Sequence, residues 1–185
     1  MLLLRVLAVL LTAYGAYTDY RFGILRVRLS KIALLSAPLL TALVEWFSTK
    51  SWAVAQAGAI DSVLAIVLCG VTPVMLYRLK SLGRGDLWLL PAVGGLLGLR
   101  AGVEGQMLIY VLALVLAPAK LVYEGRLFRT IGESFTLVTN LFRKPAARKP
   151  VPAVVLSTFP LGPYIFLGTL VEVFFLHVGD FLHAG

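Results

Sequence analysis

The chain has 185 residues, of which 59% are hydrophobic and only 14% are charged. A soluble domain of this length carries more charge and fewer apolar residues, so the composition excludes an ordinary soluble protein. A net charge of +8 would suggest nucleic-acid binding in a soluble protein. Here the basic residues lie between long apolar runs, which is typical of cytoplasmic loops beside anionic lipid headgroups. The composition therefore predicts a membrane protein with no nucleic-acid partner.

Six apolar runs predict membrane-spanning helices, because a helix crosses the hydrocarbon core with about 20 residues. In chain order the predicted spans are 2–17, 32–47, 52–77, 86–103, 106–122 and 153–177. Continuous apolar runs favour helices, since the strands of a barrel would alternate. The first run could be mistaken for a signal peptide, but no basic residue precedes it, so we interpret it as a retained span. We expect an all-α, polytopic transmembrane helix bundle that forms a single domain over residues 1–185.

The basic residues also predict how the chain is oriented. Fourteen of the 17 lie in or directly beside the first, third and fifth loops, and the fifth, about 123–152, is the only long loop. The positive-inside rule places these three loops in the cytoplasm and both termini outside. The long loop is either a solvated segment beside the lipid headgroups or a lid near a cytoplasmic active site.

Two of the nine acidic residues lie at the same predicted membrane depth. Asp19 is at the cytoplasmic end of the first span, and Asp86 is at the cytoplasmic start of the fourth. Two such carboxyl groups can share one proton, so that one deprotonates a water and the other hydrogen-bonds a scissile carbonyl. Gly83 and Gly85 leave room for an extended peptide beside Asp86. The pattern predicts a dyad that hydrolyses peptides. The alternative for each aspartate alone is a structural role, in which its negative charge balances the arginines of the neighbouring loop.

Several residues inside the spans have expected structural roles. Asp61 lies well within the third span and is expected to face the bundle interior, with either a structural hydrogen bond or a functional role. Gly94 and Gly98 form a small-xxx-small pair that lets another helix pack closely. Cys69 is the only cysteine, which excludes an internal disulfide and a multi-cysteine zinc site, and it is expected in the core.

Other polar and aromatic side chains are predicted near the outer membrane surface or at an interface. The expected interfacial side chains are Trp46, Trp52, Tyr110 and Glu172. His177 and His183 lack the spacing of metal ligands, so we expect neither a metal nor another cofactor.

Three segments together resemble one family. Gly83-Arg84-Gly85-Asp86, followed by Gly94 and Gly98, resembles the Gly-x-Gly-Asp motif of type IV prepilin peptidases and archaeal preflagellin peptidases. Asp19-Tyr20-Arg21 resembles their Asp-x-Arg motif, and Pro160-Leu161-Gly162-Pro163 resembles the proline-glycine segment of their last core helix. The resemblance implies Asp19 and Asp86 as the catalytic pair. It also implies that the following residues belong to the motifs or bind substrate: Arg21, Gly83, Gly85, Pro160, Gly162 and Pro163.

The resemblance implies an intramembrane aspartyl endopeptidase in the inner (cytoplasmic) membrane, with no cofactor. Its partners would be membrane lipid and a pilin-like or flagellin-like precursor, whose basic leader it would cleave at the cytoplasmic face. Larger family members carry an N-terminal segment with paired cysteines and also N-methylate the product. With one cysteine and no such segment, this chain resembles the short forms, and no methyltransferase activity is expected.

Two positions depart from the family pattern. Leu25-Arg26-Val27 stands where Ile-Pro-Asn is frequent, and Trp88 stands where a lysine is frequent. These departures give weight to an alternative, a catalytically degenerate homologue that binds precursors or scaffolds a secretion machine. A small transporter is a third hypothesis, because Asp61 is intramembrane and Pro160 and Pro163 are expected to break the sixth span.

Overall fold

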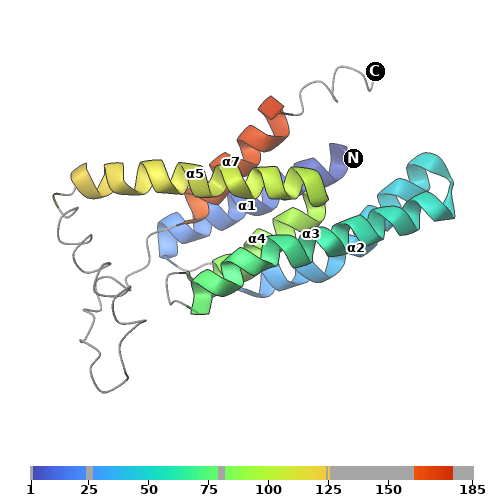
Figure 1. The fold of residues 1–185 in the computed structure, drawn as a ribbon, viewed down its shortest axis with the longest axis horizontal. Coiled ribbons are helices and arrows are strands. Elements are labelled where there is room, and N and C mark those ends of the chain that lie inside the picture. The colour runs from blue at the N-terminus through green and yellow to red at the C-terminus, as the bar shows by residue number, and fades with distance from the viewer. Residues whose placement is uncertain (1, 24–26, 79–81, 124, 126–160, 177–185) are drawn as a thin grey trace.

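The computed structural model describes residues 2–23, 27–78, 82–123, 125 and 161–176, and within these residues the secondary structure is entirely helical. The helices are α1 (Leu2–Phe22), α2 (Val27–Thr49), α3 (Trp52–Arg78), α4 (Arg84–Leu97), α5 (Leu99–Tyr123) and α7 (Gly162–Val171), and α7 continues as the π-helix η2 (Glu172–Leu176) (Figure 1). Four segments are long and apolar enough to cross a membrane: Leu2–Phe22, Val27–Thr49, Trp52–Arg78 and Leu99–Leu116. The predicted all-α membrane class is therefore confirmed, whereas six spans with both termini outside stay a prediction.

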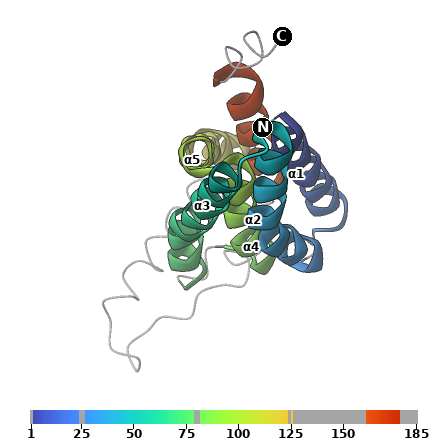
Figure 2. The same ribbon diagram turned by 90° about the vertical axis from the view of Figure 1, so that its right-hand side faces the viewer.

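The short helix α4 is the centre of the bundle. It contacts each of α1, α2, α3, α5 and α7, and it lies among these helices in Figure 2. Every residue from Leu89 to Leu96 is buried. A helix that is apolar on all sides belongs in a protein interior, so α4 is enclosed by protein.

The predicted span 86–103 is divided between two helices. α4 ends at Leu97, and Gly98 adopts φ +86°, a left-handed conformation that L side chains rarely adopt. α5 begins at once with Leu99, so the predicted fifth span also begins several residues earlier than expected. Hydropathy continues through Gly98 without a break, whereas the helix ends there because the backbone turns.

Glycines allow the central helix to approach its neighbours closely. A Cβ at Gly94 would lie 2.7 Å from Cys69 Sγ, and one at Gly102 would lie 2.9 Å from Gly94 Cα. Cys69 is fully buried, as predicted. Gly94 thus serves the close packing expected of it, whereas Gly98 ends the helix. The hydrogen bond from Ser62 Oγ to Gly95 O, 2.8 Å long, further joins α3 to α4.

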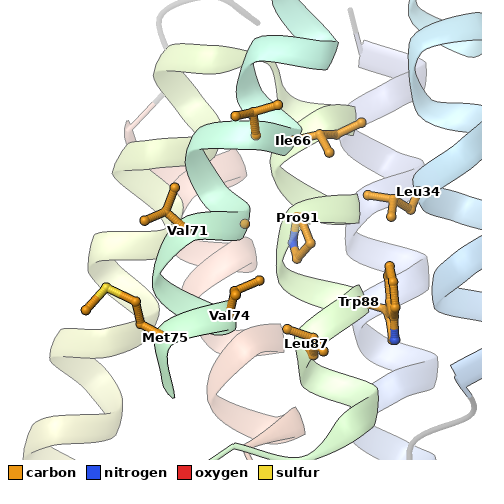
Figure 3. A pocket seen from close by; sticks show the side chains of 10 residues that line it. Leu34, Ile66, Val71, Val74, Met75, Leu87, Trp88 and Pro91 are labelled. Atoms are coloured by element: carbon orange, nitrogen blue, oxygen red, sulfur yellow. The ribbon is translucent and has the colours of Figure 1, made fainter. Parts of the chain in front are cut away.

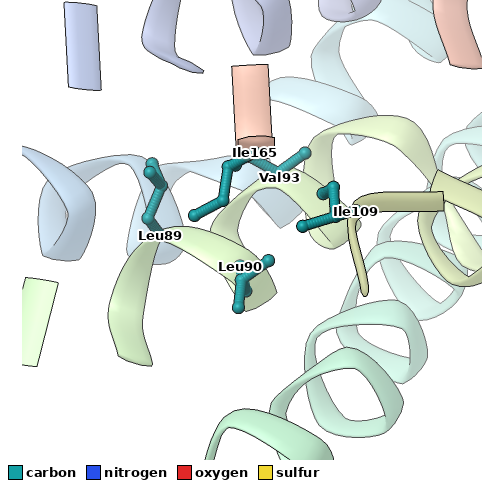
Figure 4. Packing of buried hydrophobic residues seen from close by; sticks show 5 residues of the cluster. All are labelled: Leu89, Leu90, Val93, Ile109 and Ile165. Atoms are coloured by element: carbon teal, nitrogen blue, oxygen red, sulfur yellow. The ribbon is translucent and has the colours of Figure 1, made fainter. Parts of the chain in front are cut away.

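The larger hydrophobic core joins α4 to α5 and α7. Figure 4 shows its five buried side chains, Leu89, Leu90, Val93, Ile109 and Ile165, pointing toward one another. Leu89 is the third residue after Asp86 and Leu90 the fourth, so the face of α4 that carries the core also carries Asp86. The core therefore fixes the rotation of α4 and, with it, the direction of the Asp86 side chain.

Several predicted features lie outside the described residues. They are the departure at residues 25–26, Pro160, both histidines, the first part of the predicted sixth span and nearly all of the long loop. Of the proline-glycine segment, the described part begins at Leu161, and α7 begins at Gly162 with Pro163 in its first turn.

Candidate active site

Asp19 lies in the last turn of α1, against the start of α7. Its Oδ2 accepts a hydrogen bond of 2.8 Å from the backbone N–H of Gly162. The first N–H groups of a helix have no partner within the helix, and they suit a carboxylate. A Cβ on residue 162 would lie 2.8 Å from the Asp19 Cβ and 3.1 Å from the Ala16 Cα. The contact between α1 and α7 therefore requires glycine at this position.

Asp86 lies in the first turn of α4 and is only 8% exposed. The backbone N–H of Gly83, the residue that precedes the helix, donates a hydrogen bond to its carboxyl group. This is the reciprocal contact by which an acidic residue in the first turn satisfies the N-cap N–H. Among the described residues, Asp86 Oδ1 is buried without a hydrogen-bond partner. A buried acceptor of this kind is costly, and such atoms are frequent at catalytic sites.

The two aspartates approach each other where α1 ends and α4 begins. The charge of Asp19 acts on the Asp86 carboxyl group, so the two groups interact electrostatically. α1 is also packed against α4 and α7, which holds the three helix ends together. Two interacting carboxyl groups, one half-buried and one buried, can share a proton and can act together on a water and a carbonyl.

The remaining predicted site residues divide into two groups. Gly83 and Gly162 each donate a hydrogen bond to one of the two aspartates, and Gly85 and Pro163 lie beside them in the first turns of α4 and α7. Arg21 is exposed and turned along its own helix. Its Nη1 donates to Tyr17 Oη at 2.6 Å, and its guanidinium lies over the Tyr17 and Phe22 rings. The structure therefore does not join Arg21 to the carboxyl pair.

Trp88, one of the two departures from the family pattern, contacts a cation from another helix. The Nζ of Lys31, on α2, lies 4.8 Å from the centre of the Trp88 ring. A cation over an indole face is attracted by the negative face of the ring. A lysine is thus present near this position, although it comes from α2.

Asp61 has a structural hydrogen bond, which is one of the two roles expected for it. Its Oδ2 accepts a hydrogen bond of 2.9 Å from the backbone N–H of Leu99, the first residue of α5. It also lies against Gly98, where a Cβ would be 2.8 Å from Asp61 Oδ2. Asp61 therefore caps the start of α5 from a neighbouring helix, which satisfies a backbone donor inside the bundle.

Two predicted interfacial residues are part of the interior. Tyr110 packs beside the main core, and its hydroxyl accepts a 3.0 Å hydrogen bond from Gln106 Nε2, which also donates to Cys69 O at 2.9 Å. Glu172 is 1% exposed and begins η2. Gln106 was not among the predicted site residues, although a glutamine four residues before a tyrosine in an apolar run is a signal for such a pair.

Comparison with known proteins matches most of the described helices to one family. The model of the type IV leader peptidase family matches residues 6–120. This range includes Asp19, Asp86 and Asp61, and it ends before α7. No curated protein and no solved structure matches the chain.

Proposed function

Because this chain belongs to the type IV leader peptidase family, we propose that it is an intramembrane aspartyl endopeptidase whose catalytic pair is Asp19 and Asp86. The observation that carries the proposal is the electrostatic interaction between these carboxyl groups where α1 ends and α4 begins. Each also accepts a hydrogen bond from a glycine N–H at the start of a helix, Gly162 for Asp19 and Gly83 for Asp86. These two anchors would hold the pair in a defined geometry.

The reaction follows from the chemistry of a shared proton. One carboxyl group, ionised, takes a proton from a water, and the oxygen of that water attacks the scissile carbonyl carbon. The other, protonated, donates its hydrogen to the carbonyl oxygen as negative charge develops there. When the tetrahedral intermediate collapses, the C–N bond breaks and a proton passes to the leaving amine. Asp19 and Asp86 supply both functions without a further group.

The substrate in this proposal is a pilin-like or flagellin-like precursor in the inner membrane. The carboxyl pair lies where α1 ends and α4 begins, which the positive-inside rule assigns to the cytoplasmic side. A precursor anchored in the bilayer would present its basic leader at that surface. Gly83 and Gly85 would allow its backbone to approach Asp86, because neither residue has a side chain beyond Cα.

The test is a cleavage assay with the purified full chain in vesicles. The substrates are pilin-like precursors with a basic leader that ends in glycine, and the variants are Asp19→Asn and Asp86→Asn. We expect each variant to lose about 10²- to 10⁴-fold in cleavage rate, the usual contribution of general acid–base catalysis. Asp61→Asn is the matched control, because an asparagine oxygen can still accept the Leu99 N–H, and its rate should stay near that of the parent.

Two results would contradict the proposal. Retained cleavage in folded Asp19→Asn or Asp86→Asn protein would show that the pair is not catalytic. Absence of cleavage by the parent chain over a broad precursor panel, with precursor binding retained, would favour the scaffold alternative. The contact of Trp88 with Lys31 would then be the next feature to alter.

A further inference from the structure

An apolar groove runs between α2, α3 and α4, on the side of α4 away from Asp86. It has a volume of about 480 Å³, within the range of about 300–1,000 Å³ typical of ligand sites. Its ten lining residues are all apolar or glycine, and Figure 3 shows Leu34, Val71, Val74, Leu87 and Trp88 around it. Val67, Val71 and Met75 are exposed. Because α2 and α3 are long enough to span a membrane, this groove opens toward lipid.

One end of the groove is surrounded by cations from all three helices. Lys31 precedes Leu34 by three residues, Arg78 follows Val74 by four, and Arg84 precedes Trp88 by four, so each shares a helix face with a lining residue. All three basic side chains are exposed. Lys31 also lies directly over the Trp88 ring.

These charges discriminate between possible occupants. A basic leader would be repelled by three cations at the mouth, and a neutral apolar helix would gain nothing from them. An anionic phospholipid matches both parts, because its phosphate can bind lysine and arginine and its acyl chain can fill an apolar groove. The cationic end is also the end that the positive-inside rule places in the cytoplasmic leaflet, where anionic lipids create a negative surface potential.

We propose that this groove is a binding site for an anionic phospholipid, with the headgroup between Lys31, Arg78 and Arg84 and one acyl chain along Val74, Leu87 and Pro91. Trp88 lies at the junction of headgroup and chain, a position that indole side chains favour at membrane interfaces. The bound lipid fills the groove behind α4, opposite the carboxyl pair. The inference is independent of the proposed peptidase activity, because it concerns another face of α4.

The test uses quenching of Trp88 fluorescence by brominated acyl chains. Trp46→Phe and Trp52→Phe leave Trp88 as the sole tryptophan of the three in the chain. The protein is placed in phosphatidylcholine vesicles that contain equal fractions of either brominated phosphatidylglycerol or brominated phosphatidylcholine. We expect stronger quenching by the anionic lipid, and we expect each cation that is replaced by glutamine to lower this preference about fivefold.

Two further variants separate the parts of the site. Lys50→Gln is the matched control, since it removes a cation that lies over the Trp46 and Phe47 rings at the other end of α2, and it should leave the preference unchanged. Gly70→Leu adds a side chain to the groove beside Pro91, where a Cβ would make ordinary contact at 3.8 Å, and it should reduce quenching while all three cations remain.

Three outcomes would overturn the inference. Equal quenching by the two brominated lipids would exclude selection by charge. An unchanged preference after Lys31→Gln, Arg78→Gln and Arg84→Gln are combined would exclude the headgroup site. Relief of quenching by a neutral apolar helical peptide, equal in the parent and the triple variant, would identify the groove as a helix-docking surface.

Discussion

Asp19 and Gly162 are separated by 143 positions in the chain, yet a hydrogen bond of 2.8 Å joins them where α1 meets the start of α7. The contact is possible because glycine has no Cβ. A Cβ at residue 162 would overlap the Asp19 side chain and press against the α1 backbone. It also gives the Asp19 carboxyl group a backbone donor at the start of a helix, where negative charge is favoured. Residue 162 thus determines how closely α7 approaches the candidate catalytic pair.

Gly162→Ala should therefore displace α7 from Asp19. We expect a loss of about 1–3 kcal/mol in the free energy of unfolding, typical of overpacking, and a lower cleavage rate because Asp19 loses its donor. Unfolding in detergent and cleavage of a precursor would measure both effects. Gly70→Ala is the control for helix stability, since its Cβ would meet Pro91 at an ordinary 3.8 Å. An unchanged unfolding temperature in Gly162→Ala would show that α7 does not need the close approach.

The residues of the site differ in how well the sequence predicts them. Asp19 and Asp86 are predictable, because loop charges and apolar runs assign them the same depth. The hydrogen bond to Gly162 is not, because it depends on the backbone path of α7. Arg21 shows the opposite difference: the motif predicts it in the site, but its own helix offers Tyr17 as a nearer partner. A contact within the same helix can hold a motif residue away from the site. The spacing of the motif does not reveal such a contact.

At the scale of elements, the boundary between α4 and α5 is the feature that hydropathy alone does not predict. Apolar residues continue across it, so the sequence predicts that the fourth span extends to residue 103, whereas the structure ends α4 at Leu97 and begins α5 at Leu99. The break is built from the positive φ of Gly98 and from the Asp61 carboxylate, which accepts the Leu99 N–H at 2.9 Å. A cap supplied from α3 is a tertiary contact, and no local signal at residues 97–99 records it.

Asp61→Ala should leave the Leu99 N–H without its acceptor. We expect the free energy of unfolding to fall by about 1 kcal/mol, the usual contribution of a hydrogen bond, because this donor is part-buried. Asp61→Asn should lose much less, since its amide oxygen can accept the same hydrogen bond. Chemical unfolding of both variants would measure the difference, and equal losses would indicate that the charge of Asp61, rather than its hydrogen bond, matters.

Gly98→Ala should be destabilising for two separable reasons. The positive φ is strained for alanine by about 1–3 kcal/mol, and the new Cβ would lie 2.8 Å from Asp61 Oδ2. A double-mutant cycle separates these causes, because the overlap disappears in the Asp61→Ala background and the strain remains. We expect Gly98→Ala to cost less in that background. Strictly additive losses would mean that the overlap contributes nothing.

At the scale of the whole molecule, the sequence predicts the class but not the arrangement. Long apolar runs predict the four helices that can span a membrane, because that signal is a sum over about 20 residues. The central position of α4 is not predictable in this way. It is a short helix of 14 residues, and its contacts with five other helices come from packing of residues far apart in the chain.

The orientation of the bundle makes a direct prediction. Thr49 lies at the end of α2 and Arg84 at the start of α4, and both are exposed. The test replaces each of them, in separate variants, with cysteine (Thr49→Cys and Arg84→Cys). If the first, third and fifth loops are cytoplasmic, a membrane-impermeant thiol reagent added to intact cells should label Thr49→Cys and not Arg84→Cys. Native Cys69 is buried and should stay unlabelled. Labelling of Arg84→Cys without permeabilisation would reverse the proposed topology.

The three glycines around the turn between α4 and α5 have a consequence for how this protein can evolve. Gly94 meets Cys69 and the backbone of Gly102, and Gly98 combines a left-handed φ with the Asp61 contact. Every other amino acid would add a Cβ at these points, so no single substitution is neutral there. Descendants that keep this turn should retain glycine at positions 94, 98 and 102, whereas lipid-facing positions of α2 and α3 can exchange one apolar residue for another. The turn would then change as slowly as the other closely packed glycine positions, such as Gly162.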